Sequence, residues 1–273
     1  LALRASSEIL TKALDSLDTT SIVDSSYLLL QNMNRFWRRG GWAKGQQLEK
    51  WYGDMIGSIC DRDITLKGIY EKFDTFIVVT GTCLNNRTTE YFTKESHPNM
   101  KLAEAVRISA GYPCLFPMID FQQSQWWDGG IGDNYPIHVF DTVENGAILR
   151  RNEDDDNDDF VTIPPKHITD RIPNEKTLGF KLVSNKTDST TAITRQRATP
   201  VQINNVYDAL KSAAMMILDM SRQLHVHELD WKRSVLIDVG SLKSTDFDIQ
   251  ETEKKFLIDN GRKATEEFLT NYK

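Results

Sequence analysis

An aspartate followed by two glycines is the feature of this sequence best suited to chemistry. The tripeptide Asp128-Gly129-Gly130 directly follows two tryptophans that are typical of a strand. Open α/β sheets place their functional sites just beyond the ends of strands, and glycines let backbone or substrate come close. Asn134 follows, with a side chain able to tie the loop to its own backbone. Two interpretations are open: Asp128 is a functional carboxylate, or it caps a tight Asp-Gly turn, which the tripeptide alone favours.

A second block lies upstream, where a predicted helix ends at a glycine and a proline. It reads Ile-Ser-Ala-x-x-Pro-x-x-Phe-Pro from Ile108, and the downstream block reads Asp-Gly-Gly-x-x-x-Asn-x-Pro from Asp128. In this order and close spacing, the two blocks resemble the C-terminal catalytic half of the patatin-like phospholipase family. Weaker likenesses cover residues 41–48 and 235–262. The resemblance therefore touches most of the chain apart from two polar insertions.

The resemblance implies both a fold and a reaction. The fold is α/β, a single three-layer α/β/α sandwich with a mixed central sheet over residues 1–273. The reaction is hydrolysis of an ester of a phospholipid or another acyl lipid by a Ser/Asp dyad, without metal or cofactor. Asp128 is the proton-accepting partner of the serine, and Gly129, Gly130 and Asn134 belong to the site loop. A carboxylate hydrogen-bonded to a serine hydroxyl in a dry pocket stabilises the departing proton.

The nucleophile of such a dyad is not in the sequence. The chain holds no Gly-x-Ser-x-Gly and no glycine-rich oxyanion turn, and Ser109 falls where the family has a structural serine. The opening Leu1-Ala2-Leu3 resembles the run that follows the nucleophilic serine, so we expect the serine and the first strand to precede Leu1. These residues alone should then be inactive. The alternatives are a non-catalytic lipid-binding or interaction protein on a degenerate scaffold, and a thioesterase or neutral-lipid lipase with the same dyad.

Composition is that of an ordinary globular protein. The sequence has 33 Lys and Arg against 39 Asp and Glu, a formal charge of −6, and 40% hydrophobic residues. An acidic chain without clustered cations is not expected to bind nucleic acid. Cys60, Cys83 and Cys114 cannot complete a disulfide set and are expected to be reduced core thiols. No stretch reaches the roughly 20 apolar residues of a membrane span. We expect a cytoplasmic or peripheral membrane protein rather than a secreted one.

Periodicity predicts helices alternating with strands, which is typical of an α/β layered domain. Helices are expected at residues 6–17, 46–60, 66–73, 102–109, 135–143, about 202–229 and about 251–268. Strands are expected at 75–82, 88–93, 177–183 and 234–239. Polar surface insertions are expected at about 150–173 and 185–200. The first insertion is acidic, but its spacing does not fit a calcium loop.

The segment 31–45 is expected to be a loop with an unusual composition. In one interpretation Trp37, Arg38, Arg39 and Trp42 make a peripheral membrane contact, since Trp prefers the headgroup boundary and Arg attracts anionic lipid. In the other, which we favour, both indoles pack on the core and the arginines form a solvated rim.

Other side chains are expected to have structural roles. Trp126 and Trp127 should alternate, with one ring in the core and the other toward the site. The five histidines stand in no recognisable catalytic setting and are expected to be surface or core residues. The methionines at 215, 216 and 220 are expected to pack in the core rather than to line an acyl-chain groove.

Overall fold

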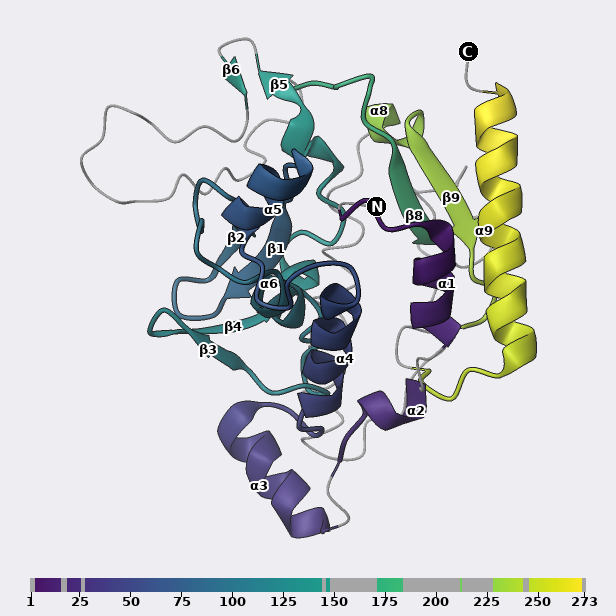
Figure 1. The fold of residues 1–273 in the computed structure, drawn as a ribbon. Helices are drawn as coiled ribbons and strands as arrows, with labels where there is room; N and C mark the ends of the chain where they lie inside the picture. Colours follow the sequence, from purple (N-terminus) through teal and green to yellow (C-terminus); the bar gives the residue numbers. More distant parts are fainter. Residues whose placement is uncertain are drawn as a thin grey trace.

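The structure is a computed structural model, and it describes residues 3–15, 19–25, 28–143, 146–147, 171–183, 212, 228–242 and 246–271. In this part of the chain helices and short strands are interspersed (Figure 1). The α-helices are α1 (Ser7–Asp15), α2 (Thr19–Ile22), α3 (Leu29–Arg39), α4 (Gln46–Gly57), α5 (Leu66–Phe73), α6 (Leu102–Ser109), α8 (Glu228–Trp231) and α9 (Glu251–Asn271). The strands are β1 (Val79–Cys83), β2 (Thr88–Phe92), β3 (Ile119–Phe121), β4 (Ser124–Asp128), β5 (Thr142–Val143), β6 (Gly146–Ala147), β7 (Arg171–Ile172), β8 (Gly179–Val183) and β9 (Ser234–Asp238). Two 3₁₀ helices cover Gly129–Ile131 and Ile137–Phe140.

The described strands form three small sheets. The largest has the order β2-β1-β4-β3, and every neighbouring pair in it is antiparallel. A second antiparallel sheet has the order β6-β5-β7, and β8 pairs with β9 in parallel. Among the described residues, the strands of the expected single mixed sheet are thus found in three separate sheets, two antiparallel and one parallel. The structure shows a mixed α/β arrangement of helices and small sheets.

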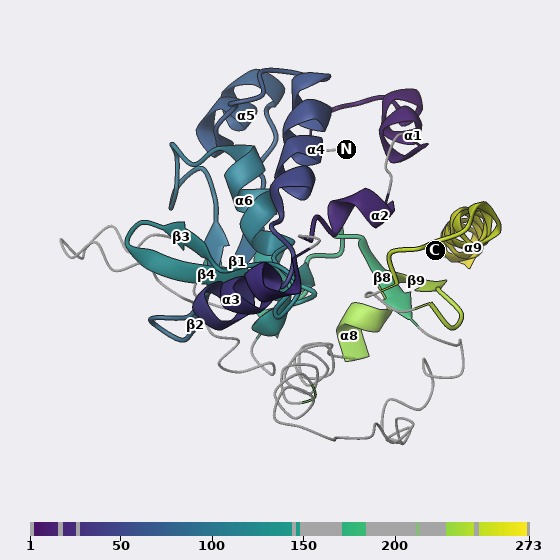
Figure 2. The same ribbon diagram turned by 90° about the horizontal axis from the view of Figure 1, so that it is seen from below.

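Different helices cover the four-stranded sheet and the β8–β9 pair. Helix α6 packs on β1 and β4, and α4 packs on α6, whereas α9 lies along β9 on the other side of the molecule (Figures 1 and 2). The main core lies between α5, α6 and the large sheet, and its most buried side chains are Ile56, Leu66, Ile69, Cys83, Phe92, Ala105 and Ile108. A smaller cluster joins α2, α4 and the segment after α6 through Ile22, Ala43, Leu48 and Phe116.

Local signals account for the elements that were predicted correctly. Helix α5 begins after Thr65, whose hydroxyl accepts a 3.0 Å hydrogen bond from the N–H of Gly68. Helix α6 covers the predicted residues and stops before Gly111. The strands β1, β2, β8 and β9 and the helices α1, α4 and α9 lie within a few residues of their expected positions.

Two segments differ from their predictions. The expected loop at 31–45 is largely helix α3, because Gly40 ends a helix rather than preventing one: at φ 72° its N–H donates to the carbonyl of Phe36 at 2.8 Å. The expected helix at 135–143 is instead the 3₁₀ helix Ile137–Phe140 followed by β5. Strand β5 pairs with β7, so backbone groups that a helix would use are taken by a partner distant in sequence.

Several expectations fall outside the described residues. These are residues 150–170 and 185–200 of the two insertions, the expected helix up to residue 227 with its methionines, and His167, His225 and His227. Among the residues that are described, no helix has the length and apolar content needed to cross a membrane. The three cysteines are free, and one of them is buried in the main core while the other two are half-buried.

Candidate active site

Asp128 ends β4, and its backbone is held from two sides. Its N–H donates to the carbonyl of Gly111, 3.2 Å away, in the turn after α6. Its carbonyl accepts a 2.8 Å hydrogen bond from the hydroxyl of Thr82 on β1, the strand that pairs with β4. The two tryptophans before it alternate in burial as predicted, since Trp126 is buried in the core and Trp127 is half-buried. The large sheet and the turn after α6 together fix the position of the aspartate.

The carboxylate of Asp128 also has a structural role. Its Oδ1 accepts a 2.8 Å hydrogen bond from the N–H of Gly130, and this bond caps the following 3₁₀ turn. The capped Asp-Gly turn considered from the sequence is thereby confirmed. It does not exclude chemistry, because an ionised carboxylate has two oxygens with about four acceptor positions. The capping bond holds the group in one orientation.

Close packing requires a glycine at position 129, and Gly130 also has near neighbours. A Cβ on Gly129 would lie 2.1 Å from Oγ1 and 2.4 Å from the carbonyl oxygen of Thr80 on β1. A Cβ on Gly130 would lie 2.6 Å from Oδ1 of Asn134, whose exposed side chain thus leans over the turn. The turn is therefore pressed against β1 in a way that other residue types do not allow.

The structure brings the separate blocks of the family-like pattern together. The N–H groups of Trp42 and Ala43 donate to the carbonyls of Cys114 and Leu115 at 3.1 and 2.8 Å. The turn after α6, which belongs to the same block as these carbonyls, bonds in turn to the aspartate. Backbone hydrogen bonds thus link all three stretches to one another.

A buried arginine that was not singled out from the sequence lies in the same region. Arg107, in the last turn of α6, is 4% exposed, and within the described part of the chain its Nε and Nη1 have no hydrogen-bond partner. Burial lowers the pKa of Arg107, and the carboxylates of Glu49 and Asp24 oppose that shift. Burial raises the pKa of Tyr52 on α4. The positive charge of Arg107 opposes this shift, and the negative charge of Asp128 adds to it. Arg107 and Asp128 thus both lie within electrostatic reach of the Tyr52 phenol.

A buried polar cluster supports the far side of the turn. The hydroxyl of Tyr91 donates to Oδ2 of Asp133 at 2.8 Å and lies 3.3 Å from Nε2 of His138, which is 3.5 Å from the same carboxylate. Burial, and then the neighbouring Asp133, raise the pKa of Tyr91. Asp133 also accepts a 3.2 Å hydrogen bond from the N–H of Tyr135. Asp133 therefore makes the loop-tying bond for which Asn134 was the candidate, and His138 has the structural role expected.

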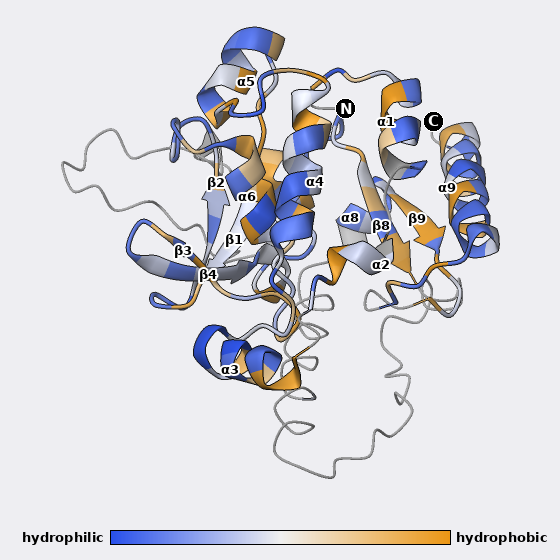
Figure 3. Cartoon of the chain, turned by 60° about the horizontal axis from the view of Figure 1, so that its bottom comes forward, coloured by the Kyte–Doolittle hydropathy of each residue, from blue (hydrophilic) through white to orange (hydrophobic). Residues whose placement is uncertain are grey.

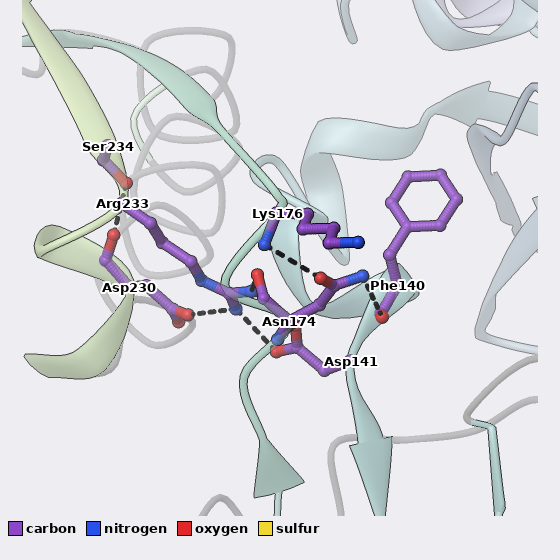
Figure 4. A network of polar contacts seen from close by, with 7 residues as sticks. All are labelled: Phe140, Asp141, Asn174, Lys176, Asp230, Arg233 and Ser234. Carbon is purple, nitrogen blue, oxygen red and sulfur yellow. Dashed lines mark hydrogen bonds and ion pairs between the residues drawn. The ribbon is translucent and has the colours of Figure 1, made fainter. Parts of the chain in front are cut away.

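Beyond the turn, a buried ion network joins Asp141 to the part of the molecule that holds β8 and β9. Figure 4 shows Arg233 between Asp141 and Asp230. Its Nη1 and Nη2 donate to the two oxygens of Asp141 at 2.5 Å each, and Nη2 also donates to Asp230 at 2.7 Å. Nη1 reaches the carbonyl of Asn174 at 3.1 Å. The network anchors the end of the segment that carries the candidate site.

Comparisons with known proteins identify a family and several relatives. The patatin-like phospholipase family matches residues 1–141, which include the whole candidate site. The uncharacterized protein R571 of Acanthamoeba polyphaga mimivirus is 25% identical over 272 residues, which are 98% of this chain and 77% of that protein. The uncharacterized protein YqhO of Bacillus subtilis is 22% identical over 275 residues, 95% of this chain and 79% of that protein. The probable lipid hydrolase 463L of Invertebrate iridescent virus 6 is 30% identical over 78 residues, 29% of this chain and 27% of that protein.

Proposed function

Because the chain belongs to the patatin-like phospholipase family, we propose that it is a lipid acyl hydrolase in which Asp128 is the proton-accepting half of a Ser/Asp dyad. The observation that carries the proposal is how firmly Asp128 is held: the Thr82 hydroxyl and the turn after α6 fix its backbone, and the N–H of Gly130 orients its carboxylate. A viral relative that is named a probable lipid hydrolase supports a lipid ester as the substrate.

The proposed reaction splits a carboxylic ester in two steps. In the first, the serine hydroxyl attacks the ester carbonyl, its proton passes to the Asp128 carboxylate, and the alcohol part of the lipid leaves with that proton. In the second, water attacks the acyl-serine and gives a proton to Asp128. The fatty acid then leaves as the serine oxygen takes the proton back. Backbone N–H groups of an oxyanion turn stabilise the negative oxygen of both tetrahedral intermediates.

The serine is proposed to come from a Gly-x-Ser-x-Gly elbow upstream of Leu1, since the 273 residues contain no such motif. The strand before that elbow would complete the three-layer sandwich, with residues 1–273 forming most of one domain. Arg107 supports the proposal of an upstream elbow, because its buried Nε and Nη1 have no hydrogen-bond acceptor among the described residues. The backbone carbonyls of an elbow are acceptors that such donors require. The 273 residues alone would not catalyse the reaction.

Hydrolysis by the complete protein, made from its full reading frame, tests the dyad. The substrates are phosphatidylcholine vesicles and a soluble short-chain p-nitrophenyl ester. Asp128→Asn keeps a side chain that can cap the turn but removes the base, so ester cleavage should fall at least about 100-fold while the fold is retained. Asp54→Asn changes an exposed aspartate of α4 and should leave the rate unchanged. Full activity of the Asp128→Asn variant would refute the proposed mechanism.

The second candidate function is non-catalytic lipid binding, or an interaction role, on the same scaffold. The lack of a nucleophile motif in the sequence favours it. The two functions differ in the upstream residues: a reading frame that continues into Gly-x-Ser-x-Gly supports the hydrolase, and a start codon just before Leu1 supports the binding protein. Fluorophosphonate labelling of an activated serine in the complete protein distinguishes them in solution. A thioesterase or neutral-lipid lipase would share the dyad and is recognised by comparing rates on thioesters, triacylglycerol and phospholipid.

A further inference from the structure

Helix α3 turns its polar side toward the protein. Its buried residue is Asn32, which is 3% exposed. Arg35 donates to Oδ1 of Asn32 at 3.2 Å and to the carbonyl of Trp42 at 2.7 Å. Arg39 forms an ion pair with Asp120 beside β3 and β4. Polar contacts therefore join this helix to the rest of the molecule.

The opposite side of the helix carries large apolar side chains. Leu30 is 78% exposed, Trp37 73% and Met33 43%, and their spacing of three and four places them on one face. Leu28 and Leu29, which are 60% and 61% exposed, extend this surface at the N-terminal end. We call these five residues the α3 apolar face. Figure 1 shows α3 projecting from one end of the molecule, and in Figure 3 one end of the helix is coloured as strongly hydrophobic.

This orientation is the reverse of that in a core-packed helix. Surface helices of globular proteins normally bury the apolar stripe and expose the polar one. Burial of apolar surface is the main favourable contribution to folding and association, so a contiguous exposed patch of large apolar side chains marks a binding surface. The α3 apolar face therefore points to something that covers it.

The charges around the helix indicate what that partner is. Residues 28–48 contain Arg35, Arg38, Arg39 and Lys44 but no Asp or Glu, in a chain whose formal charge is −6. Exposed Trp and Leu beside basic residues are the composition of helices that lie in an anionic lipid interface. A symmetric pair of copies would instead set the same cations against each other. The pattern favours a lipid surface over self-association.

The helix also adjoins the candidate active site. Gly40 ends α3, and a Cβ there would lie 2.5 Å from Cζ2 of Trp127, the residue before Asp128. The N–H of Met118 donates to the carbonyl of Arg39 at 2.9 Å. One packed indole thus separates the end of α3 from the aspartate, so lipid held by the helix is close to the site.

We propose that α3 is an interfacial helix that docks this protein on an anionic lipid surface, with the α3 apolar face at the acyl boundary and Arg38 among the headgroups. This inference rests on the proposed function: if the protein is a lipid hydrolase, docking delivers substrate toward Asp128. The interpretation favoured from the sequence, in which both indoles pack on the core, is wrong for Trp37, which is 73% exposed. The exposed indole is Trp37, whereas Trp42 is half-buried and Arg39 is engaged by an aspartate.

Vesicle sedimentation with the complete protein tests docking. The vesicles are phosphatidylcholine mixed with phosphatidylserine, and phosphatidylcholine alone. We expect binding to the anionic vesicles that weakens several-fold between about 0.1 M and about 1 M salt, because the attraction to the headgroups is screened. The double variant Leu30→Gln/Trp37→Gln should bind at least about tenfold more weakly. The matched control is Leu269→Gln, which removes a 59% exposed leucine from α9 and should bind like the unchanged protein.

Cleavage of the soluble p-nitrophenyl ester separates docking from catalysis. A double variant that loses vesicle binding but cleaves the soluble ester at the original rate supports docking. Vesicle binding that needs the α3 apolar face, in a protein that cleaves no ester, supports docking and refutes the hydrolase. Unchanged vesicle binding by a folded double variant overturns docking and leaves the hydrolase intact. Docking is also overturned if the protein does not bind vesicles but forms a dimer that the double variant abolishes.

Discussion

Arg233 meets Asp141 through two parallel hydrogen bonds of 2.5 Å, although 92 positions separate the two residues in the sequence. The same guanidinium reaches Asp230 at 2.7 Å, and all three side chains are buried. Arg233→Met would leave two buried carboxylates without their cation, so we predict a loss of about 3–5 kcal/mol in the free energy of unfolding. Urea unfolding followed by circular dichroism measures this loss. A change below about 1 kcal/mol would contradict a role for the network in stability.

Arg107 is a second buried arginine, and it contrasts with Arg233 because no carboxylate is bonded to its Nε or Nη1 in the described residues. Because its Nε and Nη1 have no partner among the described residues, we predict that Arg107→Met changes the unfolding free energy of the 273-residue chain by less than about 1 kcal/mol. If an upstream elbow supplies acceptors, the same change in the complete protein should cost about 1–3 kcal/mol. Equal effects in the two proteins would argue against an elbow that bonds to Arg107.

Gly129 should not tolerate a side chain. Its added Cβ would meet the backbone and hydroxyl of Thr80 at 2.1–2.4 Å, so we predict that Gly129→Ala costs at least about 1–3 kcal/mol of stability. Gly261→Ala in the middle of α9 is the control, since its nearest neighbour would be 3.9 Å away. There the better helix propensity of alanine should stabilise the protein by up to about 1 kcal/mol. Thermal unfolding of the two variants should therefore shift in opposite directions.

The burial of Glu90 should make the stability of the protein depend on pH. Glu90 lies half-buried on β2 opposite Gly81, and burial raises the pKa of its carboxyl above the ordinary value of 4.5. The folded state therefore holds this proton more tightly than the unfolded state does. The contribution of Glu90 to the free energy of unfolding is therefore fully present below pH 4.5, and it is lost as the pH rises through the folded-state pKa of this carboxyl.

A glutamine at this position cannot ionise, which isolates the contribution. Glu90→Gln should raise the melting temperature at pH 7 and leave it nearly unchanged near pH 4. The measurement is calorimetry of both proteins across that range. A variant that is less stable than the parent at pH 7 would show that ionised Glu90 is stabilised by a neighbour.

The parts of this fold that could be predicted are those whose signals lie close together in the sequence. Helix α5 has its cap at Thr65 and α6 has its breaker at Gly111, so both were predicted to the residue. The turn at Asp128 is equally local, because the carboxylate bonds to an amide only two residues away.

The parts that could not be predicted depend on distant partners or on reversed burial. Helix α3 buries Asn32 and exposes Leu30, so its pattern does not point to a core. The segment 135–143 gives up helical bonding because β5 pairs with β7. Tyr52 comes near Asp128 only when α4 packs on α6. Arg107 offered one signal, since it directly precedes the Ile-Ser-Ala block, but its burial depends on the packed fold.

The ion network at Asp141 lies where the match to the family model stops. The family match stops at residue 141, yet the Asp141 side chain is held by Arg233, and the hydroxyl of Tyr135 lies 2.7 Å from that of Ser234. A Cβ on Gly179 would strike the Tyr135 hydroxyl at 1.9 Å, so the two regions are interlocked. The end of the family match thus falls in a packed interface and not in a linker. A protein cut after residue 141 would lose Arg233, Ser234 and Gly179, and with them the packing against Asp141 and Tyr135 next to the candidate site.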